Sequence, residues 1–206
     1  MILLLAYDGV DELDLVGAYS VLSKAGNISG PADFGVILNV KLIGTSNLIK
    51  TAGSITLSEV ELISELTLAD AVIVPGGRGA SAAAEDPRIQ TFMKGMQARG
   101  VPVFSICSGA LIVARAGLAY GKRIAIHHDK KPSLSLLAVG EIASGLVTDQ
   151  TLCSVGGDIS MSVKSVDIAF EVLARFAPHT IGAVSKRMEL YPGRCGDAST
   201  MAESVS

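Results

Sequence analysis

One cysteine stands where a reactive side chain would be well placed. Cys107 lies in the run Ser105-Ile106-Cys107-Ser108-Gly109, between a short apolar segment and a segment with helical spacing. The small residues around it permit a sharp turn from a strand into a helix, with the thiol projecting into a cleft. Unpaired amides and the positive dipole end at the start of a helix stabilise a thiolate and raise its nucleophilicity. A cysteine is equally suited to be a small buried hydrophobic residue, so the spacing alone leaves both interpretations open.

Three further side chains could exchange a proton with that thiol. His127 and His128 come 20 and 21 residues after Cys107 and follow a candidate strand, so the fold could return one imidazole to the same cleft as an acid or base. Adjacent residues in a strand point to opposite faces, so we expect at most one of the two to face the thiol. A solvated surface position is the alternative. Asp14 closely follows the first apolar segment and could either reach the cleft or simply cap a helix.

Two glycines could bring backbone amides close to a substrate. Gly76 and Gly77 follow another apolar segment, and with the amide of Ser108 they could form an oxyanion site, although an ordinary tight turn explains them as well. The run Gly76-Gly77-Arg78-Gly79 lacks the lysine of a phosphate-binding loop, so nucleotide binding is weakly supported. No set of His, Cys and carboxylate residues shows a recognisable ligand spacing, so we expect neither a metal site nor a cofactor.

These candidate residues must be positioned by strands that alternate with helices. Continuous apolar runs bounded by turn residues are typical of strands buried on both faces. They predict strands over residues 2–7, 36–43, 71–74, 101–105 and 123–126, an extended or hairpin segment over 49–57, and two short strands within 140–155. Apolar residues at helical spacing predict helices over residues 15–25, 58–66, 87–99, 108–116 and 160–176. Asp14 is the expected cap of the first helix and Asp86 of the third.

The alternation predicts an open α/β sheet, mainly parallel and covered on both faces, with the strand order 2-1-3-4-5. The active site of such a sheet lies at the carboxyl ends of its strands, where Cys107, Gly76 and Asp14 are expected. The length of 206 residues fits one domain, and no repeat or linker divides the chain. We therefore expect a single domain over residues 1–206, with a loosely ordered tail after Gly196.

Composition limits the partners and the location of the chain. Its apolar runs are shorter than the roughly 20 residues of a membrane-spanning helix, and its N-terminus lacks the basic region of a signal peptide. We therefore expect no membrane association and a cytoplasmic location. A net charge of −3, without dense clusters of Lys and Arg, predicts no nucleic-acid partner. Cys107, Cys153 and Cys195 are far apart and are expected to be free thiols in a reducing compartment.

Taken together, five motifs in this order resemble the ThiJ/PfpI-like superfamily of class I glutamine amidotransferase-like proteins. The motifs are L-D-L-V-G at 13–17, P-G-G at 75–77, S-I-C-S-G at 105–109, G-K-R-x-x-x-H at 121–127 and the Gly156-Gly157 turn. The resemblance covers residues 1–192. It looks closest to the isonitrile hydratase branch and to relatives that form the N-terminal domain of some transcription regulators. Asp14 carries this hint, because glutamate often fills its position elsewhere in the superfamily.

The resemblance implies a flavodoxin-like three-layer α/β/α sandwich that forms a homodimer. It implies Cys107 as the nucleophile, Asp14 as its acidic partner, and the amides of Gly77 and Ser108 as the oxyanion site. His127 matches the histidine position of the superfamily.

Three positions distinguish this chain within the superfamily. Ser108 keeps a hydroxyl directly after the nucleophile, as isonitrile hydratases do, whereas protease-like members have histidine there, which disfavours a peptidase. His128 stands where the hydratase branch commonly has an aromatic residue. Residues 157–167 form a longer segment than the branch pattern has, so we expect the shape of the substrate pocket to differ.

Three functions are compatible with these residues. The leading hypothesis is a cysteine-dependent hydratase or hydrolase of a small molecule, resembling isonitrile hydratase and needing no cofactor. In it the Cys107 thiolate attacks an electrophilic carbon and Asp14 exchanges a proton with the adduct. The same residues could convert an α-ketoaldehyde such as methylglyoxal in glyoxalase-type chemistry. The third hypothesis is a non-catalytic protein that senses redox state or a ligand, in which the thiol is oxidised without turnover.

Overall fold

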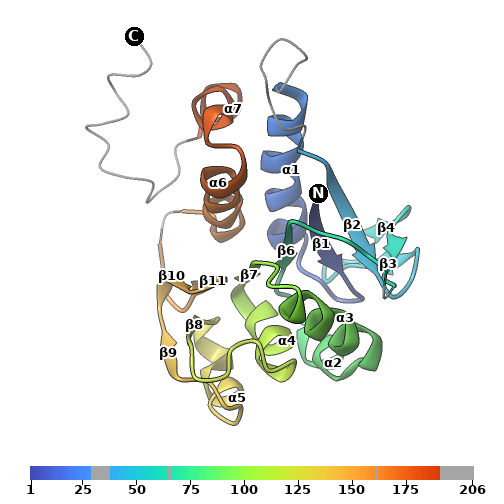
Figure 1. Cartoon of the computed structure of the whole chain (residues 1–206), viewed down its shortest axis with the longest axis vertical. Helices are drawn as coiled ribbons and strands as arrows, with labels where there is room; N and C mark the ends of the chain where they lie inside the picture. The colour runs from blue at the N-terminus through green and yellow to red at the C-terminus, as the bar shows by residue number, and fades with distance from the viewer. Residues whose placement is uncertain (29–37, 65, 161, 191–206) are drawn as a thin grey trace.

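A seven-stranded sheet forms the centre of the structure (Figure 1). The computed structural model describes residues 1–28, 38–64, 66–160 and 162–190. From one edge to the other the strands are β10 (Gly145–Asp149), β11 (Leu152–Gly156), β7 (Val103–Ile106), β6 (Ala71–Val74), β1 (Ile2–Ala6), β2 (Val40–Gly44) and β5 (Glu61–Leu62). All neighbouring strands are parallel except β10, which runs antiparallel to β11. The prediction of a mainly parallel sheet is confirmed.

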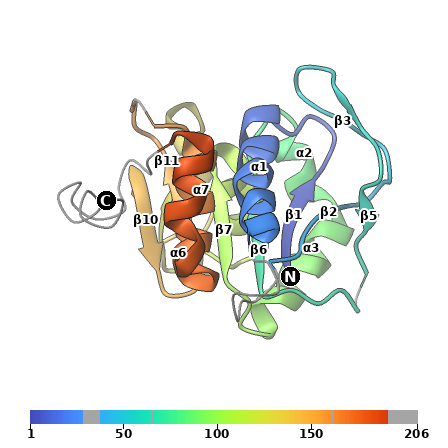
Figure 2. The ribbon, with the colours of Figure 1, turned by 90° about the horizontal axis from the view of Figure 1, so that it is seen from above.

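Helices cover both faces of this sheet, which is why its central strands are apolar throughout. Every residue of β1, β6 and β7 is buried, as expected of parallel strands without a solvent face. One face is covered by α1 (Glu12–Ile28), α6 (Lys164–Phe176) and α7 (Ile181–Met188), and the other by α2 (Ala80–Glu85), α3 (Pro87–Ala98) and α4 (Ala110–Arg115). Figure 2 shows α1, α6 and α7 in front of the strands. These layers confirm the flavodoxin-like three-layer α/β/α sandwich.

The predicted strand order holds for the centre of the sheet, where β2, β1, β6 and β7 are neighbours in that order. The next neighbour is β11. The strand predicted over 123–126 is β8 (Arg123–Ala125), which pairs with β9 (Glu141–Ala143) in a separate two-stranded sheet. The extended segment predicted over 49–57 is a hairpin of β3 (Ile49–Lys50) and β4 (Thr56–Leu57).

The helix predicted over residues 58–66 is wrong. Glu61–Leu62 form β5 instead, which pairs in parallel with the edge of β2. The amide of Ile63 continues this pairing by donating to the carbonyl of Gly44 at 2.9 Å. Hydrogen bonds to the sheet edge thus outweigh the helical spacing of the apolar residues in this segment.

The remaining helices differ from the predictions in their ends and their number. α1 continues past Gly26 to Ile28, and α6 begins at Lys164 rather than at Ser160. Asp86 caps α3 as predicted, since its side chain accepts a hydrogen bond from the backbone amide of Arg88. Three helices had not been predicted, namely α2, α5 (Lys131–Leu134) and α7. All three are short and have too few turns to show a clear apolar period.

Some predictions fall outside the described residues. These are the start of the strand predicted over 36–43, the tail after Gly196, and Cys195. Within the part of the chain that the structure describes, none of the helices has both the length and the apolar character needed to cross a membrane.

Candidate active site

Cys107 occupies a strained turn between a strand and a helix. β7 ends at Ile106, residues 107–109 form a single 3₁₀ turn, and α4 follows directly. The φ angle of Cys107 is +54°, in the left-handed region that costs a side-chain-bearing residue about 1–2 kcal/mol. A methyl group on Gly109 would lie 2.2 Å from the carbonyl oxygen of Val74, so only glycine fits there. The sharp turn predicted around Cys107 is therefore present.

Three candidate groups converge on the backbone of Gly76. A methyl group built on Gly76 would lie 2.8 Å from Oδ2 of Asp14, 2.8 Å from Cβ of Cys107 and 2.9 Å from the amide nitrogen of Ser108. The amide of Gly76 donates a hydrogen bond to Asp14 Oδ2 at 3.0 Å. The carboxyl ends of β1, β6 and β7 lie side by side, which explains how residues so distant in sequence meet.

Asp14 lies in the first turn of α1 but does not cap it. The cap is Asp11, whose Oδ1 accepts hydrogen bonds from the amides of Leu13 at 2.9 Å and Asp14 at 3.1 Å. The predicted capping role of Asp14 is therefore wrong, and its carboxyl group is left to face Gly76. Burial is the main cause that raises the pKa of Asp14 to about 7, and the negative charge of Asp11 adds to it. Asp14 can therefore both give and take a proton near neutral pH.

The pKa of the Cys107 thiol is raised as well, to about 11. Burial is the largest cause and the charge of Asp14 the second, while a hydrogen bond from the amide of Ser108 opposes them. The amide at the helix start lowers the pKa of the thiol as expected, but burial and the neighbouring acid outweigh it, so the net pKa is raised. Near neutral pH, Cys107 is therefore a thiol, and Asp14 is partly protonated because its pKa is about 7. Transfer of the thiol proton to an ionised Asp14 would create the thiolate in place.

Ser108 and Gly77 are bound to one another. The amide of Gly77 donates to Ser108 Oγ at 2.9 Å, and that hydroxyl donates back to the carbonyl of Gly77 at 3.1 Å. The Gly77 amide, expected as an oxyanion donor, is therefore already engaged. Glycine is required at this position, since its φ is +140° and a methyl group would lie 2.3 Å from the carbonyl oxygen of Gly9.

The two histidines lie after a strand and not within it. β8 ends at Ala125, and the rings of His127 and His128 stack with centroids 4.3 Å apart. The expectation that they point to opposite faces is therefore wrong, because the chain has already turned. Nδ1 of His127 accepts a hydrogen bond from the amide of Asp129 at 3.2 Å, and among the described residues no hydrogen bond or ion pair of either ring involves Cys107.

His127, His128 and Asp129 form a grouping that the sequence analysis did not anticipate. Each offers one potential ligand atom, and these atoms lie within 4.8 Å of one another. His128 and Asp129 are exposed and His127 is half-buried, so the grouping lies at the surface.

Sequence reasoning also missed two residues beside the thiol and the carboxyl. The Tyr7 hydroxyl is buried and donates to the carbonyl of Pro75 at 2.7 Å. Its pKa is raised by burial and then by the charges of Asp14 and Cys107. The available signal in the sequence was the hydroxyl of Tyr7 at the end of the apolar run over residues 2–7. Lys164 is the other residue: its charge lowers the pKa of both Asp14 and Cys107, and its place in the lengthened segment 157–167 was the clue.

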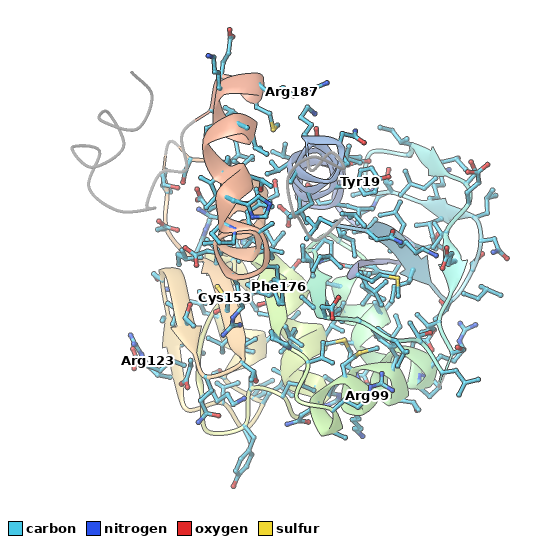
Figure 3. The ribbon with its side chains drawn as sticks, turned by 45° about the horizontal axis from the view of Figure 1, so that its top comes forward. Tyr19, Arg99, Arg123, Cys153, Phe176 and Arg187 are labelled. Atoms are coloured by element: carbon cyan, nitrogen blue, oxygen red, sulfur yellow. The ribbon has the colours of Figure 1, made fainter. Side chains whose placement is uncertain are left out.

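Cys153 is a buried thiol remote from these groups. It lies on β11 beneath α6 (Figure 3) and is only 2% exposed. Burial raises its pKa to about 11, while a hydrogen bond with the side chain of Thr148 opposes this. It serves as an internal comparison for Cys107.

Comparisons with known proteins show which proteins this chain is similar to. The model of the DJ-1/PfpI family matches residues 1–160. The chain is 29% identical over 157 residues to isonitrile hydratase from Pseudomonas putida, covering 74% of this chain and 63% of the relative. It is 24% identical over 134 residues to protein dj-1beta from Drosophila melanogaster, covering 61% of this chain and 64% of the relative. The chain thus spans less than two thirds of the length of these two relatives.

Solved structures share the fold. The crystal structure of Drosophila melanogaster DJ-1beta superposes with a TM-score of 0.78 at 19% identity, covering 92% of this chain and 97% of that one. A ThiJ/PfpI family protein from Pseudomonas syringae gives a TM-score of 0.76 at 19% identity, covering 99% of this chain and 84% of that one. The structural likeness agrees with the family match over residues 1–160. This chain belongs to the DJ-1/PfpI family.

Proposed function

We propose that this protein is a cysteine-dependent hydratase that converts isonitriles to N-substituted formamides. The observation that carries the proposal is the convergence of Asp14, Cys107 and Ser108 on Gly76. A nucleophile and an acid whose pKa is about 7 stand at one backbone position. This combination suits addition of a thiol to a carbon that must also receive a proton.

The reaction begins when the thiol proton of Cys107 passes to Asp14. The sulfur then bonds to the isonitrile carbon, and Asp14 delivers the proton to that same carbon, which gives a thioimidate. Water next adds to the thioimidate carbon, with one of its protons going to nitrogen. The carbon–sulfur bond breaks, the second proton returns through Asp14 to the sulfur, and the formamide leaves.

Two features support this choice over the alternatives. Isonitrile hydratase from Pseudomonas putida is among the relatives, and Ser108 supplies a hydroxyl next to the nucleophile, held by Gly77. Neither feature is required of a sensor that works only by thiol oxidation.

We further propose that the protein acts as a cytoplasmic homodimer on a small-molecule substrate, as one domain and without a cofactor. The apolar side chains of Leu13, Val16 and Tyr19 are exposed by 61%, 46% and 36% on the outer side of α1, and Tyr19 is labelled in Figure 3. Exposed apolar side chains grouped on one helix support a surface that a second subunit covers.

Turnover of an alkyl isonitrile tests the proposed activity. Formation of the formamide would be followed by mass spectrometry with the wild type, with Cys107→Ser, and with Cys153→Ser as the matched control. We expect activity in the wild type and in the control and none in Cys107→Ser. Methylglyoxal is assayed in parallel. Turnover of methylglyoxal alone would replace the hydratase by glyoxalase-type chemistry, and no turnover of either compound would reject both.

A further inference from the structure

An ion pair between Lys164 and Asp158 links the start of α6 to the turn that follows β11. Asp158 follows the Gly156-Gly157 turn at the end of β11, and Val155 of that strand pairs with Ile106, the residue before Cys107. Lys164 opens α6, and its Nζ lies 3.0 Å from Oδ1 of Asp158. The two side chains are only 22% and 24% exposed. Both ends of the segment 158–164 are thereby joined at the edge of the site.

The start of α6 is fixed against the turn that carries Asp14. The hydroxyl of Ser165 donates to the carbonyl of Leu13 at 2.8 Å. One turn further along α1, a methyl group on Gly17 would lie 2.4 Å from the same hydroxyl, so the two helices approach at a residue without a side chain. Leu13 and Asp14 are neighbours, as are Ser165 and Lys164. The start of α6 is thus held against the turn that carries Asp14 by the hydroxyl of Ser165, and the ammonium group of Lys164 is held by Asp158.

The charges around the pair are otherwise negative. Asp11 is a negative charge that raises the pKa of both Asp14 and Cys107, whereas the Tyr7 hydroxyl stays neutral because its own pKa is raised well above its ordinary value. Within the described part of the chain, Lys164 is the cation whose charge acts on both members of the pair. A single cation among several acids must therefore offset the negative charge that appears when the pair loses a proton.

We infer that Lys164, held in place by Asp158, is a positioning residue that stabilises the negative charge shared by Asp14 and Cys107 and so sets the pH at which the nucleophile forms. The inference rests on the proposed function for its catalytic meaning. The influence of Lys164 on the Cys107 thiol can nevertheless be measured without turnover. Asp158 acts in the opposite sense, because its carboxylate offsets part of the ammonium charge.

The rate at which iodoacetamide alkylates Cys107, measured from pH 6 to 10 by peptide mass mapping, tests the inference. Iodoacetamide forms a carbon–sulfur bond with the thiolate and releases iodide, so its rate reports the thiolate population. Lys164→Met should move the profile to higher pH by about 0.5 to 1 unit and slow alkylation about 3- to 10-fold at a fixed pH below the midpoint. Asp158→Asn should move the profile to lower pH. Lys164→Arg keeps the positive charge and should give the wild-type profile.

Controls separate an electrostatic effect from damage to the fold. Lys186 is an exposed lysine on α7, and Lys186→Met should leave the profile in place. An unshifted profile in Lys164→Met would overturn the inference, as would shifts of Lys164→Met and Asp158→Asn in the same direction. A failure of the proposed function would show differently, as lack of isonitrile turnover in a wild type whose alkylation profile still depends on Lys164.

Discussion

Replacement of Asp14 by Asn should make Cys107 more reactive and slow the proposed turnover. The charge of Asp14 is the second largest cause of the raised pKa of Cys107, and a neighbouring charge typically shifts a pKa by about 1 unit or more. Removal of that charge should therefore speed alkylation of Cys107 by iodoacetamide at pH 8 about 10-fold. Turnover should fall by about 10²-fold, because an amide cannot carry a proton between the thiol and the substrate carbon.

The same substitution has a predictable effect on stability. Folding raises the pKa of Asp14 from 3.8 to about 7, so the carboxyl group favours the folded state while it is neutral and loses that contribution as the pH rises through about 7. Asn does not ionise. The melting temperature of Asp14→Asn should therefore exceed that of the wild type at pH 8, where the free energy of unfolding should be higher by at most about 4 kcal/mol. Towards pH 4 the melting temperatures of the two proteins should approach each other.

Three assays on one pair of proteins decide this prediction: alkylation, turnover, and melting temperature at pH 4, 6 and 8. Asp86→Ala is the matched control, because Asp86 caps α3 and is not among the groups that shift the pKa of Asp14 or Cys107; its loss should cost about 1 kcal/mol of stability and leave alkylation and turnover unchanged. Unchanged turnover together with unchanged alkylation in Asp14→Asn would refute the coupling of the acid to the thiol. Slower alkylation would show that Asp14 favours the thiolate, which is opposite to the effect expected from repulsion between two negative charges.

Local geometry supports three further predictions. Gly76→Ala should abolish turnover, because its methyl group would meet three site atoms within 3 Å, while Gly95→Ala, with nothing within 4 Å, should leave activity intact; equal activities would contradict the convergence on Gly76. Limiting iodoacetamide should label Cys107 well before Cys153, which is 2% exposed; peptide mapping that finds equal labelling would count against the nucleophile. Sedimentation at micromolar concentration should find a dimer that Val16→Glu weakens, and a wild-type monomer of 21.2 kDa would remove the proposed interface.

The centre of the fold could be predicted because burial on both faces leaves a continuous apolar run. β1, β6 and β7 were located in this way, and the order of the four central strands followed from the alternation with helices. The edges could not be predicted by the same reasoning. β5 has only two residues, both exposed, and β8 pairs with β9 outside the main sheet, so both depend on partners that local periodicity does not report.

The position of the candidate residues in the fold could be predicted, but not their ionisation. Cys107, Asp14 and Gly76 stand at the ends of predicted strands or just after them, which is where parallel sheets place their sites. Whether the pKa of Cys107 is raised or lowered depends on how deeply the thiol is buried and on how close Asp14 lies. Neither can be predicted from the spacing of residues in the sequence. The stacking of His127 on His128 could not be predicted for a similar reason, because the chain turns after Ala125 and Nδ1 of His127 accepts a hydrogen bond from the amide of Asp129.

The central claim is that Cys107 forms a covalent bond with the substrate carbon during turnover. The most direct measurement is rapid acid quenching of the wild type with an alkyl isonitrile, followed by mass mapping of the peptide that contains Cys107. We predict a mass gain equal to one isonitrile on that peptide, present during turnover and lost when the substrate is exhausted. The claim would be contradicted if Cys107→Ala released formamide at the wild-type rate while the wild-type peptide never gained mass.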